Sequence, residues 1–175
     1  LRLISTPIGG KQERCHQVEI WRNSRDQLRV EATCPEEGGG EKLQVVVRDG
    51  LEIYYFDPML KKFYPLEGQI PENIPVKTLE DYGRDLVEAA DFKLLGEEKK
   101  TRHSYYLAEV IPPEPHRQRC LDKIWLETES LLPVRIESYD ANSCLRQVTF
   151  FEHILLNPSL EAALFETDQP AAVGQ

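Results

Sequence analysis

The chain has 175 residues, 41% of them hydrophobic, and its acidic residues outnumber the basic ones by 30 to 21, for a formal charge of −9. That length can bury a sizeable core, and the acidic balance argues against nucleic-acid binding, which needs basic residues to neutralise phosphates. No apolar run reaches the roughly 18 residues of a membrane-spanning helix.

The first third of the chain alternates apolar and polar residues with a period of two, which is typical of β-strands. We expect a tight hairpin turn at Asp49-Gly50, because this pair supplies the positive φ angles of a type I′ turn. Three glycines at 38–40 predict an irregular loop. The strands are predicted at 1–6, 15–23, 27–34, 42–58 on either side of the hairpin turn, and 61–66.

One convincing helix follows, over residues 78–91. Thr78 is a good N-cap, and Asp81 three residues later resembles a capping box. The apolar stripe at helical spacing consists of Leu79, Tyr82, Leu86 and Ala89 or Ala90. The preceding stretch 68–75, rich in Gly and Pro, reads as an ordered crossing loop.

Strand patterns then resume to the end of the chain, and the total of about ten strands predicts a mainly β fold with one large antiparallel sheet. A sheet of that size curls or closes. We expect the helix and the loop at 70–75 to cover its concave face, in a single domain over residues 1–168 with a disordered tail at 169–175. The later strands are predicted at 92–100, 103–113, 120–127, 133–140 and 145–156, with a short helical turn at 157–166.

Four acids lie close together in "WLETESLLPVRIESYD": Glu127, Glu129, Glu137 and Asp140. A glycosidase needs two carboxylates about 5–9 Å apart in a cleft, one of them with a raised pKa. Strand alternation instead places the first two at the end of a hairpin and Glu137 outward beside Arg135. We expect solvated surface acids and no enzymatic activity.

The spacing of potential ligand residues does not indicate a metal or cofactor site. The four histidines, His16, His103, His116 and His153, lie far apart without ligand spacing, and no cysteine pair has zinc-site spacing. No glycine-rich phosphate loop precedes a helix. We expect neither metal nor cofactor.

The even number and wide spacing of the cysteines favour disulfides in an exported protein, with buried free thiols as the alternative. Cys15 and Cys34 face each other if their hairpin pairs positions summing to 49, whereas a slip of one residue lines up other pairs. Cys120 and Cys144 are the weaker candidates, since they flank a middle strand at about 9–10 Å.

Consecutive aromatic residues on the predicted strands point to opposite faces, so both faces carry bulky apolar groups. One set can simply fill the core under the helix. Alternatively, the inner set lines a hydrophobic cavity open to a ligand. The predicted cavity residues are Val46, Ile53, Tyr55, Leu107, Leu126, Ile136 and Phe150.

Four stretches in order resemble bacterial lipoprotein carriers of the LolA/LolB kind: "VEIWRNSRDQLRVE", "VVVRDGLEIYYFDPMLKKFYPL", "IWLETESLLPVRIESYDANSCLRQVTFFEHILLN" and "ALFETDQP". The motif residues are Trp21, Arg29, Glu31, Asp49, Gly50 and Pro133. The resemblance implies an open, strongly curved antiparallel half-barrel, with helices on its concave side and a cavity for lipid or lipoprotein acyl chains.

The resemblance further implies an exported protein of the bacterial cell envelope or a periplasm-like compartment, anchored by an N-terminal lipid upstream of Leu1. We expect it to bind a lipid or a lipoprotein acyl chain. The alternative, known in germination lipoproteins of this fold, is a filled cavity and a role in binding another envelope protein or a second copy of the chain.

Overall fold

The computed structural model describes residues 2–5, 14–23, 27–33, 42–49, 52–57, 59–66, 78–100, 103–117 and 119–167. Packing divides the chain into two compact units. The first comprises residues 1–15 and 77–154, and the second comprises 16–76 and 155–175. The expected tail at 169–175 lies outside the described residues, and the domain limits of 1–168 stay a prediction.

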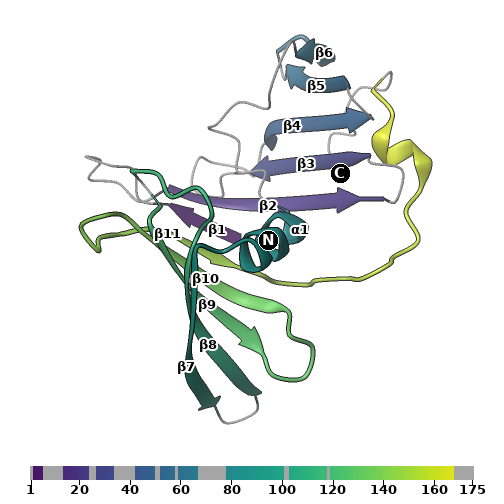
Figure 1. Ribbon diagram of the computed structural model, residues 1–175. Coiled ribbons are helices and arrows are strands. Elements are labelled where there is room, and N and C mark those ends of the chain that lie inside the picture. The colour runs from purple at the N-terminus through teal and green to yellow at the C-terminus, as the bar shows by residue number, and fades with distance from the viewer. Residues whose placement is uncertain are drawn as a thin grey trace. The chain divides into compact units, whose positions relative to one another are not determined.

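The first unit is an antiparallel sheet accompanied by one helix (Figure 1). Five of its strands follow one another as a meander, and the strand from the start of the chain joins the last of them. In spatial order the strands are β1 (Arg2–Ser5), β11 (Leu145–Phe150), β10 (Pro133–Tyr139), β9 (Leu121–Glu127), β8 (His103–Ile111) and β7 (Asp91–Lys100).

Cross-strand register places one apolar row on the face of this sheet that meets the helix. Ala108 lies opposite Ile124, Ile124 opposite Ile136, and Ile136 opposite Thr149. All four side chains are buried. The row therefore forms the floor on which the helix packs.

The helix α1 (Leu79–Val87) begins as the sequence predicts. The Asp81 N–H donates to Thr78 Oγ1 (3.2 Å) and the Thr78 N–H donates to Asp81 Oδ2 (2.8 Å), so the capping box is formed. The helix ends at Val87, earlier than the predicted residue 91. It stops there because the chain turns into β7, where the Ala90 N–H donates to the carbonyl of Ile111.

The second unit is also an antiparallel meander, ordered β2 (Arg14–Arg22), β3 (Leu28–Thr33), β4 (Lys42–Asp49), β5 (Glu52–Asp57) and β6 (Lys62–Leu66). Its core joins Phe56 of β5 to Phe165 of the 3₁₀ helix η1 (Ala162–Phe165). Trp21 packs against this cluster.

Arg29 on β3 links this strand to η1 within the second unit. Its guanidinium pairs with Glu31 at 2.6 Å and donates to the carbonyl of Leu164 at 2.9 Å. Both charged side chains are buried, which requires such pairing. The motif residues Trp21 and Arg29 thus hold η1 in place, and Glu31 supports Arg29.

Three details of the strands differ from the sequence-based expectations. The β2–β3 register pairs Val18 with Ala32, a sum of 50, so the one-residue slip is the observed alternative. Asp49 pairs with Glu52 and is itself the last residue of β4, so an Asp49-Gly50 turn is wrong by one residue. β11 ends at Phe150 instead of running to 156.

Among the described residues the fold is therefore mainly β and antiparallel, with one α-helix. The crossing loop at 68–75, which was expected to cover the sheet, lies outside the described residues. Within the described part, no helix has the length and apolar character needed to cross a bilayer.

Candidate functional site

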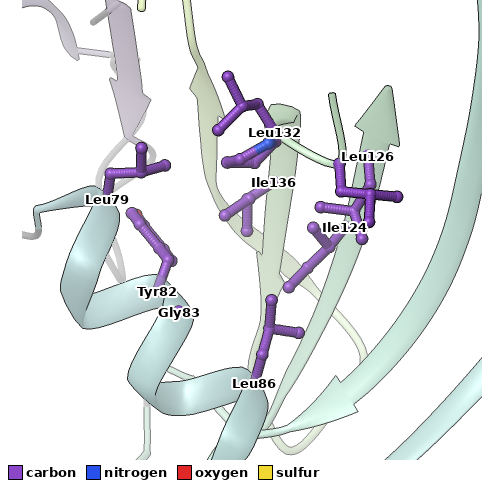
Figure 2. Close-up of a pocket in the computed structure, with 10 residues that line it drawn as sticks. Leu79, Tyr82, Gly83, Leu86, Ile124, Leu126, Leu132 and Ile136 are labelled. Carbon is purple, nitrogen blue, oxygen red and sulfur yellow. The ribbon is translucent and has the colours of Figure 1, made fainter. Parts of the chain in front are cut away.

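An apolar pocket of about 170 Å³ lies in the first unit, between α1 and the β9–β10 hairpin. Figure 2 shows Tyr82 and Leu86 of the helix pointing toward Ile124 and Ile136 of the sheet. The pocket is lined by Leu79, Tyr82, Gly83, Leu86, Ile124, Leu126, Leu131, Leu132, Pro133 and Ile136. Every lining side chain except Tyr82 is hydrocarbon or, at Gly83, absent.

Tyr82 supplies the lining's only side-chain hydroxyl, and that hydroxyl is already engaged. It is hydrogen-bonded to Thr149 on β11, and burial raises the pKa of the Tyr82 phenol to about 12, an effect that the bond to Thr149 offsets only in part. The ring meets Phe151 edge-on. Tyr82 therefore anchors α1 to the sheet and presents its ring, not its hydroxyl, to the pocket.

A partly buried cluster of ion pairs joins the same helix to the sheet. Arg119 pairs with Asp85 of α1 at 2.8 Å and donates through Nε to Asp122 of β9 at 2.9 Å. Asp122 has no exposed surface and also accepts a hydrogen bond from Ser138 Oγ (2.7 Å). These fixed polar contacts hold α1 over the sheet while the space beneath it remains apolar.

The outer wall of the pocket comes from the short connection between β9 and β10. The Leu131 N–H donates to the carbonyl of Glu127 (2.8 Å), and the Glu127 N–H donates to the carbonyl of Leu132 (2.9 Å). Leu131 has a φ of 56° and is 59% exposed. Pro133 then starts β10 and is buried against the pocket.

The predicted cavity residues are divided among three places. Leu126 and Ile136 line the pocket. Leu107 and Phe150 belong to the opposite face of the sheet, in the row that contains Trp125 and Arg135. The remaining three predicted residues, Val46, Ile53 and Tyr55, belong to the second unit.

The row on the opposite face is held by a cation–π stack. The Arg135 guanidinium lies 4.9 Å from the ring centroid of Trp125 and 5.4 Å from that of Phe150. Phe150 is absent from the pocket because its register pairs it with Arg135, on the face opposite to Ile136.

Sequence reasoning missed most of the lining, which comes from α1 and from the hairpin connection. The sequence predicts Leu79, Tyr82 and Leu86 as the apolar stripe of a helix that covers the concave face, and does not place them among the cavity residues. The stripe was the available signal, because a helix that covers a concave sheet must also border any space left beneath it. The "SLLP" connection carried no such signal.

The four acids of the hairpin are less solvated than predicted. Glu137 is 8% exposed and Asp140 is 6% exposed, so for these two the expectation of solvated acids is wrong. Burial is tolerated because Glu137 pairs with Arg135 and Asp140 accepts from Arg146 Nε at 2.8 Å. Backbone N–H donation from Cys144 and the Arg146 guanidinium lower the pKa of Asp140, the opposite of what a general acid requires.

Cys120 and Cys144 are free thiols, so the weaker predicted disulfide is not formed. Their main chains contact opposite sides of the end of β10: the Cys120 N–H donates to Tyr139, and the Asp140 N–H donates to the carbonyl of Cys144. The Cys15 side chain and Cys34 lie outside what the structure describes, and their disulfide stays a prediction. Among the described residues, no three potential ligands gather as a metal site.

No protein-family model and no curated protein matches the chain. Solved structures do. MucB is similar over 97% of this chain and 56% of its own, with a TM-score of 0.53 and 14% identity. A putative outer membrane lipoprotein-sorting protein domain from Vibrio parahaemolyticus is similar over 89% of this chain and 70% of its own, with a TM-score of 0.46 and 17% identity. The Pseudomonas aeruginosa MucA/MucB complex is similar over 85% of this chain and 48% of the matched chain, with a TM-score of 0.46 and 18% identity.

The fold of this chain is similar to that of MucB. The resemblance to carriers of the LolA/LolB kind, drawn from the strand motifs, stays a prediction. The chain spans only about half the length of the MucB chains.

Proposed function

We propose that this chain binds the acyl chain of a lipid or lipoprotein in the pocket beneath α1, without catalysing a reaction, as an exported protein of the cell envelope. The observation that carries the proposal is the apolar pocket itself, enclosed by the helix and the β9–β10 hairpin. The proposal includes the half-barrel curvature, with the pocket on its concave side. The predicted resemblance to LolA/LolB carriers and the similarity of the fold to MucB support this reading.

The pocket volume limits what can enter. Sites for drug-sized ligands measure about 300–1,000 Å³, whereas an apolar cavity of about 150 Å³ holds benzene. At about 170 Å³, this pocket holds the terminal segment of an acyl chain while the remainder lies outside. Burial of that segment supplies the affinity through the hydrophobic effect.

Gly83 gives a direct test, because it lines the pocket and a Cβ built on it meets no atom within 4 Å. Gly83→Leu adds a side chain at this wall from a Cβ position that is open, and Gly83→Ala is the matched control. Affinity for a fluorescent fatty-acid analogue, together with native mass spectrometry of the complex, measures binding.

We expect one acyl chain per protein, affinity within about threefold of the parent for Gly83→Ala, and a loss of about tenfold or more for Gly83→Leu. Failure of the parent protein to take up any acyl probe would overturn the proposal. Equal binding by the parent and Gly83→Leu would place the lipid somewhere other than this pocket.

A second candidate function, binding of another envelope protein or a second copy, is favoured by β7. This strand is the edge of the first unit's sheet, and nine of its ten residues are exposed. Three are large and apolar: Phe92 (50%), Leu94 (56%) and Leu95 (41%). An exposed apolar edge is a template for an added strand.

Leu94→Lys tests the second candidate, since a charge blunts an edge strand at little cost to the fold. If the protein associates through β7, the variant sediments as a smaller species than the parent or loses the co-purifying partner. Unchanged sedimentation of an associating parent would exclude β7 as the interface.

A further inference from the structure

Leu131 combines two features that conflict with its residue type. Its φ of 56° lies in the left-handed region, which bulky residues rarely occupy and which glycine or asparagine adopts readily. Its side chain is also 59% exposed. Neither the backbone conformation nor burial therefore accounts for a leucine at this position.

The turn does not require a leucine at this position. The connection is held by hydrogen bonds of its backbone and of Ser130, whose Oγ donates to Glu127 Oε2 (2.7 Å) and accepts from the Leu132 N–H (3.2 Å). Leu131 takes part only through its backbone N–H. Glycine would serve the turn better, because it adopts this φ without strain.

The core does not require it either. The core cluster beneath α1 consists of Tyr82, Ala108, Val110, Ile124 and Ile136, with four further side chains packed against it, and Leu131 is in neither set. The surface that Leu131 does contribute to is the wall of the pocket. Backbone strain retained at a ligand site is a recurrent sign of function.

We infer that Leu131 is the ligand-contact residue that closes the pocket mouth over an aliphatic chain, which enters with its methyl end first. This inference rests on the proposed function. The chain end contacts Leu131 as it passes into the space beneath α1, and the exposed part of the leucine becomes buried on binding.

The direction of entry follows from the chemistry of the lining. A carboxylate or head group buried there would need a partner. The lining offers no charged side chain, and the Tyr82 hydroxyl is hydrogen-bonded to Thr149. The polar end of the ligand therefore stays outside the pocket, in water.

The test compares Leu131→Gly, Leu131→Asn and Leu131→Met in the whole chain. Glycine and asparagine suit the φ, so both variants should unfold at a temperature equal to or above that of the parent. Both should bind palmitate about tenfold more weakly, since an apolar contact is removed. Leu131→Met restores an apolar contact and should bind within about threefold of the parent.

A matched ligand pair tests the direction of entry. Hexadecanedioic acid has the length of palmitate but a carboxyl group at both ends, so the parent should bind it at least about tenfold more weakly. Equal affinity for the two acids would overturn methyl-first entry. Palmitate binding unchanged by Leu131→Gly would overturn the role of Leu131 while leaving the proposed function standing, whereas a parent that binds neither acid would overturn both.

Discussion

The ring of Tyr82 on α1 meets that of Phe151 edge-on, with centroids 5.4 Å apart and planes inclined at 80°. Phe151 directly follows β11, and the bond from Tyr82 to Thr149 reaches the same strand. One side chain thus joins the helix above the pocket to β11. Edge-to-face pairs are worth about 0.5–1.5 kcal/mol beyond their burial.

Tyr82→Phe keeps the ring and removes the hydroxyl, so it isolates the bond to Thr149. We expect a loss of about 1 kcal/mol in the free energy of unfolding at pH 7. The measurement is urea denaturation followed by tryptophan fluorescence, and acyl binding serves as the control because the ring is retained. An unchanged midpoint would show that water satisfies Thr149 equally well.

The same variant alters the response to alkaline pH. The Tyr82 pKa is about 12 in the folded protein against 10.0 ordinarily, so its stabilising contribution is complete below pH 10 and is lost between 10 and 12. A shift of two units corresponds to about 3 kcal/mol. Tyr82→Phe should lose stability less steeply over that range, although the pKa of Tyr139 is also about 12. Parallel declines would contradict the assignment.

Arg119→Met should be the most destabilising of these single changes. It leaves Asp122 as a fully buried carboxylate without its cation and removes the ion pair with Asp85 on α1. Breaking a buried ion pair from one side costs about 3–5 kcal/mol. Thermal unfolding checks the loss, with Asp85→Asn as a control that should cost much less. Equal costs for the two variants would contradict the importance of Asp122.

Gly83→Ala should stabilise the protein. A glycine within a helix costs about 1 kcal/mol relative to alanine, and a Cβ here meets no atom within 4 Å. We expect the free energy of unfolding to rise by about that amount in denaturant titrations. A decrease would show that the space beside Gly83 is filled in solution, for example by a bound chain.

Asp140 should contribute to stability on the acid side. Its carboxylate accepts from the backbone N–H groups of Asn142 and Cys144, each at 2.9 Å, and its pKa is lowered from 3.8. A lowered pKa means that the contribution is present above pH 4 and is lost as the pH falls through the folded-state value. Asp140→Asn should make acid unfolding between pH 5 and 2 shallower than in the parent. An identical acid profile would assign the transition to other carboxylates.

Local patterns predicted the elements well because their causes are local. Alternation along the chain marked the strands, and Thr78 with Asp81 marked the start of α1. Element ends were less predictable. β11 ends at Phe150. Beyond it, His153 and Asn157 have φ values of 57° and 54°. The apolar run "FFEHILL" does not predict this left-handed conformation.

The pocket was harder to predict because both faces of β8, β9 and β10 carry apolar side chains. Alternation separates Leu107 from Ala108 and Trp125 from Ile124, but it does not say which of each pair lies beneath the helix. That choice depends on where α1 docks and on the pairing of distant polar groups such as Asp85 with Arg119. The β2–β3 register differs by one residue from the pairing that sets Cys15 opposite Cys34, and the observed register places Val18 opposite Ala32, apolar against apolar.

The core pairing of Phe56 with Phe165 has a consequence for biosynthesis. All of the strands β7 to β11 are translated between these two phenylalanines. The strands of the second unit therefore leave the ribosome before β7 to β11, but their core is completed only when the segment carrying η1 emerges. Early synthesis therefore does not let these strands complete their core early. Until η1 emerges, their apolar faces need another source of shielding from association.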